Sequence, residues 1–247
     1  MHSSTRPPLT GRGRFAFVAL LLACLGLVAA VQLANAATSV TIYKNSLDSA
    51  SKRSDVGQFN RKGRCTKGGS DSAFRIKVGK ETRECSYRVP VAGKSIYVTA
   101  TGRLFESTPQ RIRKRTFLGL SLRHSSSGAR YQLVVYPSTT RAQIRKVGSN
   151  GKVTILAGET LGRKRVKPLG RANQLSFGAY NGTKGKPASN ARLFARVNGK
   201  RVLLVDDPKG NELSGTGSTF SIGSDQNARN AAGSFSKLVV RMPDPFD

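Results

Sequence analysis

The sequence predicts an all-β sandwich of about a dozen short antiparallel strands, folded as one domain. Three observations support this prediction. From Ala37 onward apolar residues recur mainly at period two, helical spacing rarely persists beyond two turns, and turn-forming residues separate the apolar segments at short intervals. No shift in composition marks a linker, and roughly 200 residues of this pattern suit one large sandwich better than two domains.

Alternation within each segment justifies the individual strands. Residues 116–123 place three leucines on one face, whereas residues 130–136 are apolar on both faces apart from Gln132, as expected of a central strand. In chain order, the expected strands are 38–44, 73–78, 84–89, 95–104, 116–123, 130–136, 141–147, 152–156, 175–180, 192–197, 202–205, 219–222 and 235–242.

Turn chemistry separates these strands. The pairs Asn150-Gly151 and Asn198-Gly199 predict two-residue type I′ hairpins, because both central residues of such a turn need a positive φ angle. Two polar segments, 45–72 and 181–190, are expected to run over the surface with little regular structure.

Residues 1–36 have the features of a secretory signal peptide. Three arginines precede an apolar run, and small residues follow at the −3 and −1 positions of a signal-peptidase site. Cleavage is expected between Ala36 and Ala37, which leaves 37–247 as the folded domain. Two alternatives stay open, an uncleaved membrane anchor and lipidation at Cys24. The sequence therefore predicts a secreted protein, extracellular or associated with the cell wall.

Removal of the signal peptide would leave Cys65 and Cys85 as the only cysteines. In an oxidising compartment two cysteines normally pair, so we predict a disulfide between them. Closing a loop of this span would stabilise the fold by roughly 3 kcal/mol in the chain-entropy model.

Charge and composition restrict the classes of function. Lys and Arg number 42 against 13 Asp and Glu, giving a net charge of +29, which attracts polyanions. With no Trp, two His, two Met and three Cys, the chain lacks the ligands for haem or for multi-histidine metal sites. The composition therefore predicts an acidic partner and no cofactor.

The second half of the chain carries an ordered series of short structural motifs. In order, these are Leu118-Gly119-Leu120, Arg130-Tyr131-Gln132-Leu133, Asn173-Gln174-Leu175, Val197-Asn198-Gly199-Lys200 with Asp206-Asp207, and Ile222-Gly223. The series resembles the concanavalin A-like lectin/glucanase superfamily, in particular its laminin-G-like and sugar-hydrolase-like jelly-roll domains. The resemblance covers about half of the mature chain. It implies a jelly-roll β-sandwich whose concave sheet commonly binds glycans, and it implies no particular catalytic residues.

Catalysis finds little support in the motifs. The E-x-D-x-x-E strand of glucanases in this superfamily is absent, and so is a G-x-S-x-G nucleophile turn that could use His124, which is expected to face solvent. Jelly-roll alginate lyases carry a Q-I-H strand, whereas here Gln143 and Ile144 are followed by Arg145. If the chain were a lyase, Gln143, Tyr180 and Arg123 would be its candidate catalytic residues.

Binding is the leading prediction. Alternating and clustered arginines can hold carboxylates bidentately, and the candidate ligand-binding residues are Arg123, Arg130, Tyr131, Gln143, Arg145 and Tyr180. Weak candidates for a calcium site are Asp206, Asp207 and Asp225, although such residues more often cap turns. We predict an exported, monomeric, non-catalytic module that binds a glycan or another cell-surface polymer, preferably an anionic one, and no specific nucleic acid. The alternatives are a divergent polysaccharide lyase or glycoside hydrolase and a merely solvated basic surface.

Overall fold

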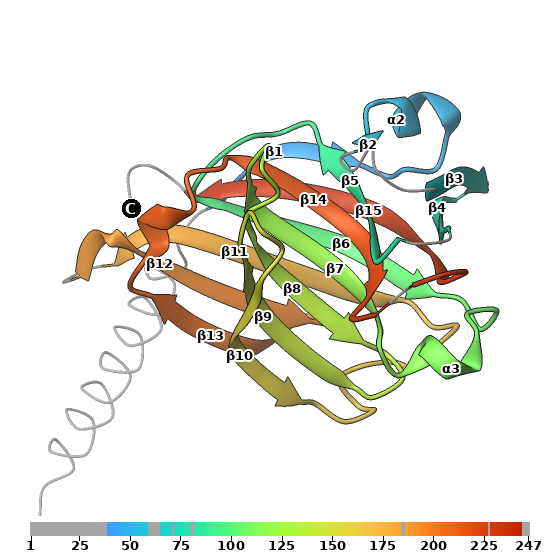
Figure 1. Ribbon diagram of the computed structural model, residues 1–247. Helices are drawn as coiled ribbons and strands as arrows, with labels where there is room; N and C mark the ends of the chain where they lie inside the picture. The colour runs from blue at the N-terminus through green and yellow to red at the C-terminus, as the bar shows by residue number, and fades with distance from the viewer. Residues whose placement is uncertain are drawn as a thin grey trace, which may run out of the picture. The chain divides into compact units, whose positions relative to one another are not determined.

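The computed structural model describes residues 39–58, 65–70, 72–79, 82–183, 186–226 and 228–243 (Figure 1). The predicted signal peptide lies outside the described residues, together with its cleavage site at Ala36 and Ala37 and with Cys24. The sandwich is the compact unit Val40–Pro243. Within the described part of the chain, no helix is both long enough and apolar enough to cross a membrane.

Two sheets lie face to face (Figure 1), and the pairings along both strand orders are antiparallel. The seven-stranded front sheet has the order β10 (Val153–Thr160), β9 (Arg141–Val147), β8 (Arg130–Tyr136), β7 (Thr116–His124), β14 (Gly217–Ser224), β5 (Glu84–Val89), β2 (Gly57–Gln58). The eight-stranded back sheet has the order β13 (Lys200–Asp207), β12 (Lys186–Val197), β11 (Asn173–Thr183), β6 (Ile96–Leu104), β15 (Ala232–Pro243), β4 (Ala73–Val78), β3 (Cys65–Ser70), with β1 (Ser39–Asn45) paired to β15. Short helices are α2 (Ala50–Ser54), α3 (Gln110–Arg113) and the 3-10 turn η1 (Gly210–Glu212).

Alternation decides which side chains form the core between the sheets. In β7 the side chains of Leu118, Leu120 and Leu122 are buried in the main core. Phe117, from the opposite face of the same strand, belongs to a separate small cluster on the outer side of the front sheet, with Tyr136. The outer face of the front sheet therefore carries this small apolar cluster among mainly polar side chains.

The predicted all-β sandwich is confirmed, and four strands, β4, β5, β8 and β9, have the predicted boundaries. The expectation of little regular structure over 181–190 is wrong, because β11 and β12 extend into it and pair at Thr183 and Lys186. Ladder hydrogen bonds join backbone groups, so strands can extend through residues with no apolar pattern. For the same reason β3 forms within the polar segment 45–72, where a side-chain cap from Ser49 also starts α2.

One of the two predicted hairpin turns is confirmed. Asn198 and Gly199 both have positive φ angles, 51° and 81°, and join β12 directly to β13. The other turn is longer than predicted, because β9 and β10 pair only up to Val147 and Val153. In that loop Gly151 has a positive φ angle, and the Asn150 side chain accepts a hydrogen bond from the backbone of Lys152.

Candidate functional site

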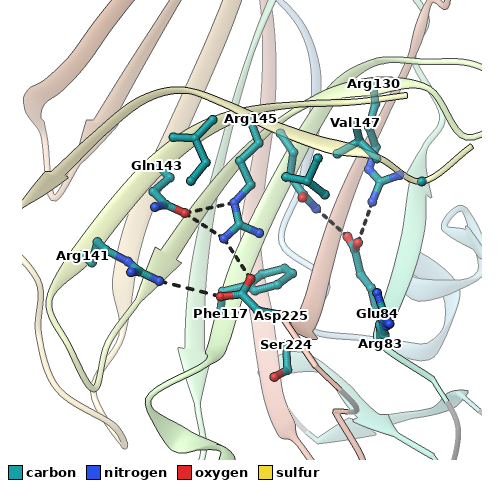
Figure 2. A pocket seen from close by; sticks show the side chains of 14 residues that line it. Arg83, Glu84, Phe117, Arg130, Arg141, Gln143, Arg145, Val147, Ser224 and Asp225 are labelled. Atoms are coloured by element: carbon teal, nitrogen blue, oxygen red, sulfur yellow. Dashed lines mark hydrogen bonds and ion pairs between the residues drawn. The ribbon is translucent and has the colours of Figure 1, made fainter. Parts of the chain in front are cut away.

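A polar cleft of about 620 Å³ lies on the outer face of the front sheet (Figure 2). Its charged and amide side chains are Arg83, Glu84, Arg130, Gln132, Arg141, Gln143, Arg145 and Asp225, and we call this site the front cleft. Strands β8 and β9 supply five of these eight side chains, since side chains two residues apart on a strand point to the same face. The period-two series Arg141, Gln143, Arg145 therefore projects into the cleft as one row.

Glu84, from β5, holds the first half of the cleft together. Its carboxylate accepts hydrogen bonds from Arg130 Nη2 at 2.6 Å, Gln132 Nε2 at 2.7 Å and Ser86 Oγ at 3.1 Å. The Arg130 and Glu84 side chains are only 14% and 11% exposed. Burial by itself raises the pKa of Glu84, but the charge of Arg130 and hydrogen bonds from neighbouring serine hydroxyls lower that pKa below its usual value. Glu84 is therefore an ionised group that fixes Arg130 and Gln132.

Asp225, just after β14, holds the second half. Arg145 Nη2 lies 2.8 Å from its carboxylate and Arg141 Nη2 lies 3.7 Å from it, while the Tyr136 hydroxyl donates to it at 2.8 Å. Arg145 also donates to Gln143 Oε1 through Nη2 at 2.7 Å and Nε at 3.1 Å, and its side chain is 9% exposed. Figure 2 shows this guanidinium between Gln143 and Asp225. Arg145 thus has one fixed orientation before any ligand arrives.

An apolar wall completes the front cleft. Val147 of β9 and Val153 and Ile155 of β10 line it, and the last two are exposed. The Arg145 guanidinium lies 5.7 Å from the ring centre of Phe117, which also lines the cleft. The cleft therefore combines fixed hydrogen-bond donors with exposed apolar surface, as ligand sites commonly do.

Three of the six predicted binding residues meet in this cleft. Arg130, Gln143 and Arg145 all line it. Tyr131 lies in the core instead, where its hydroxyl donates to Asp207 Oδ2 at 2.7 Å. Because Tyr131 follows Arg130 directly on β8, its side chain points to the opposite face of the sheet, toward the core.

Arg123 and Tyr180 also lie away from the cleft. Arg123 has a φ angle of 53° and is 1% exposed, and its guanidinium donates to the carbonyls of Lys94 and Gly210 and to Asn181 Oδ1. Tyr180 belongs to β11 of the back sheet. The candidate lyase group of Gln143, Tyr180 and Arg123 is therefore not assembled. Sequence alternation predicts which face of a strand a side chain occupies, but not which sheet the strand joins.

His124 does not face solvent, contrary to expectation. Its side chain is buried, and Nδ1 lies 3.3 Å from the Thr219 hydroxyl. Burial, followed by the charge of Arg130, lowers the pKa of His124 to about 3. The imidazole is consequently neutral at physiological pH and is a structural member of the front sheet.

The three aspartates proposed for calcium do not lie together. Asp206 pairs with Arg192 at 2.8 Å, Asp207 pairs with Lys146 at 3.0 Å, and Asp225 belongs to the front cleft. Asp206 and Asp207 are neighbours on β13 and so point to opposite faces. Across the described residues, no group of three His, Cys, Asp or Glu side chains could hold a metal ion.

Glu84 and Gln132 were not predicted to bind ligand, and Asp225 was predicted only as a weak calcium candidate. The signal for Gln132 was present in the sequence as a polar break in an otherwise apolar strand. No local pattern places Glu84 and Asp225 in this cleft, since their partners lie on β8 and β9, far away in the sequence.

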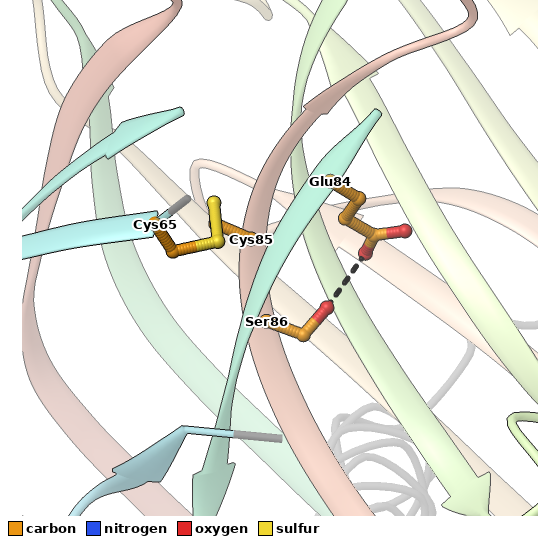
Figure 3. The surroundings of a disulfide bond; sticks show 4 residues. All are labelled: Cys65, Glu84, Cys85 and Ser86. Carbon is orange, nitrogen blue, oxygen red and sulfur yellow. Dashed lines mark hydrogen bonds between the residues drawn. A yellow bond between two sulfur atoms is a disulfide. The ribbon is translucent and has the colours of Figure 1, made fainter. Parts of the chain in front are cut away.

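The predicted disulfide between Cys65 and Cys85 is confirmed. It joins β3 of the back sheet to β5 of the front sheet. Figure 3 shows Cys85 on one side of β5 and Glu84 with Ser86 on the other. The bond therefore anchors β5, the strand that carries Glu84, to the back sheet.

Solved structures with a similar fold support the architecture. A Bacillus subtilis protein of unknown function with a galectin-like fold has a TM-score of 0.59 and 12% identity, covering 84% of this chain and all of that one. The metal-free carbohydrate recognition domain of Emp46p has a TM-score of 0.52 and 10% identity, covering 81% of this chain and 94% of that one. The carbohydrate-binding module CBM66 of Bacillus subtilis has a TM-score of 0.51 and 10% identity, covering 74% and 93%.

These likenesses define the fold. The chain has a two-sheet jelly-roll β-sandwich fold of the galectin-like kind. No protein-family model matches it, and no curated protein matches it in sequence.

Proposed function

We propose that the protein is an exported, monomeric glycan-binding module that holds acidic polysaccharides in the front cleft without cleaving them. The observation that carries this proposal is the set of guanidiniums fixed on β8 and β9. Four arginines against two carboxylates line the cleft, a net charge of 4 − 2 = +2. Arginine matches carboxylate and sulfate groups in a planar, two-pronged geometry, and pre-orienting the side chain lowers the entropy cost of binding.

Glycan binding and export have independent support. Two of the similar structures are named as a carbohydrate-binding module and a carbohydrate recognition domain. A disulfide linking the two sheets suits an oxidising, extracellular compartment.

The chemistry of the cleft favours binding over cleavage. A general acid or base works best with a pKa near the working pH. The pKa of Glu84 is lowered instead, and Asp225 is held by two arginines and a tyrosine. The two carboxylates in one cleft do make glycoside hydrolysis the second candidate function, since that reaction needs such a pair.

We expect Arg145→Lys to weaken binding of polygalacturonate at the front cleft by about tenfold, because lysine keeps the charge but loses the fork that arginine offers to a carboxylate. The control is Arg163→Lys, at an exposed loop position away from the cleft. Titration calorimetry with polygalacturonate and with neutral dextran, at low and high salt, measures both effects.

Equal loss in the two variants, or equal binding of dextran, would contradict the proposal. Samples from the same titrations are checked for unsaturated products by absorbance and for new reducing ends. Either product would identify an enzyme in place of a binding module.

A further inference from the structure

The outer face of the back sheet carries a second groove, of about 570 Å³. Four exposed cations line it: Lys44 from β1, Lys237 and Arg241 from β15, and Arg196 from β12. None of its lining residues is acidic, and none of these four forms a salt bridge within the part of the chain that the structure describes. We call this site the back groove. In contrast to the front cleft, its positive charge is not neutralised by neighbouring carboxylates.

The floor of the back groove is polar and contains one aromatic ring. Thr99 and Ser176 are cross-strand neighbours on β6 and β11, joined by a hydroxyl hydrogen bond of 3.0 Å. Tyr97 lines the groove beside them and stacks on Phe194, with ring centres 5.2 Å apart and planes at 19°. The Phe194 ring covers Gly178, where a Cβ atom would overlap it. The Tyr97 ring is therefore held in place by Phe194 of β12, whose own ring lies over Gly178 of β11.

A β-bulge adds Lys237 to this surface. The register of β15 against β6 shifts between Ser236 and Val239, and Lys237 has a φ angle of 53°. A left-handed conformation is unfavourable for lysine. The inserted residue keeps Leu238 in the core while placing Lys237 on the outer face beside Val239.

We infer that the back groove is a second binding site, for a carboxylated or sulfated polysaccharide, so that the protein bridges polymer chains through opposite sheets. The cations suit the acidic groups, the hydroxyls and the Gln174 amide suit sugar hydroxyls, and Tyr97 suits a sugar ring face. Proteins that bind single-stranded nucleic acid stack successive bases on several aromatic rings. One ring, Tyr97, lines the back groove, with Phe194 and Tyr180 stacked in turn beside it. Only the bridging part of the inference rests on the proposed function of the front cleft.

Tryptophan reporters test each site separately, because the chain contains no Trp. Tyr97→Trp reports on the back groove, and Ile155→Trp reports on the exposed wall of the front cleft. Each variant is titrated with polygalacturonate, dextran sulfate, neutral dextran and oligothymidylate at about 150 mM salt, close to physiological ionic strength.

A saturable emission change in Tyr97→Trp with the acidic polymers is the expected result, and the polymer that binds more tightly identifies the acidic group. No change there, or a stronger response to oligothymidylate, would overturn the assignment. A response in Ile155→Trp alone leaves the front-cleft proposal standing and rejects the back groove. A response in Tyr97→Trp alone rejects the front-cleft proposal and leaves the back groove standing.

A charge-matched pair of triple variants gives the second test. The first combines Arg196→Ala, Lys237→Gly and Arg241→Ala; the second combines Arg163→Ala, Lys164→Ala and Arg165→Ala, three exposed positions in the loop before β11. We expect the first triple variant to weaken acidic-polymer binding at the back groove about tenfold and the second less than about twofold, since charges that line the groove act more strongly than screened charges outside it. Equal losses would overturn the inference.

Bridging is measured as turbidity when protein and acidic polymer are mixed near equivalence. Wild type and the loop triple variant should turn turbid. The back-groove triple variant should turn less turbid while still binding through the front cleft, and Arg145→Lys should turn less turbid while still binding through the back groove. Turbidity undiminished in the back-groove triple variant would show that this face takes no part in bridging.

Discussion

Replacing Glu84 with glutamine is expected to lower the free energy of unfolding by about 3 kcal/mol, because it leaves a buried guanidinium without its counter-charge. Arg130 is the affected partner, with a 2.6 Å contact to the Glu84 carboxylate and a side chain only 14% exposed. Gln132 loses its ionised acceptor as well. Acidic-polymer binding at the front cleft should fall in parallel, since Arg130 would lose its fixed orientation.

The difference in stability between wild type and Glu84→Gln should shrink as the pH falls. Folding lowers the pKa of Glu84, so its contribution to stability is complete above the pKa in the unfolded chain, about 4.3 for a free glutamate. That contribution is lost as pH falls through the lower pKa of the folded state. Urea unfolding should therefore separate wild type from Glu84→Gln by a constant free energy near neutral pH, and the two curves should converge in acid.

Glu159→Gln is the matched control, since Glu159 is an exposed carboxylate on β10 of the same sheet. We expect it to change the unfolding free energy by less than about 0.5 kcal/mol, as is usual for surface substitutions. If Glu84→Gln were as mild as this control, or if its effect grew toward acid pH, the role given to Glu84 would be wrong.

Removing the disulfide should have a similarly large effect. The double variant Cys65→Ala with Cys85→Ala is expected to lose about 3 kcal/mol of stability, the chain-entropy cost of opening a loop of this length. The two cysteines are 20 residues apart in the sequence, and Cys85 is fully buried. Because the bond joins β3 to β5, we also expect weaker polymer binding at the front cleft, on the opposite side of β5.

Guanidinium unfolding of wild type with and without reductant, beside the double variant, measures this effect. Reduced wild type and the double variant should share one midpoint, below that of oxidised wild type. The Ile155→Trp reporter, read in the double-variant background, separates weakened binding from weakened folding. A double variant with an unchanged midpoint would mean that the sheets hold together without the bond.

The fold was largely predictable because alternation is a local property. Leu118, Leu120 and Leu122 predict an inward face in any sandwich, whichever strands come to lie beside them. The boundaries of β8 and β9 followed from the same pattern. The segments that were mispredicted, β3 and the ends of β11 and β12, are held by backbone pairing, which the side-chain pattern does not encode.

The site was only half predictable because it depends on which strands become neighbours. Gln143 and Arg145 share a face by their spacing alone, so predicting them together required nothing beyond β9 itself. Glu84 meets Arg130 although 46 residues separate them, and Arg145 meets Asp225 across 80. Tyr180 carries an equally suitable side chain, yet β11 pairs into the back sheet.

The sequence by itself therefore determined the class of fold, the disulfide pair and the basic character of the protein. Each of these depends on composition, on local periodicity or on a choice between only two cysteines. The tertiary structure decided which arginines are neutralised by Glu84 and Asp225 and which remain uncompensated in the back groove. The physical reason is that charges interact over a few ångströms of space, and in a jelly roll those distances are set by the order of strands in each sheet.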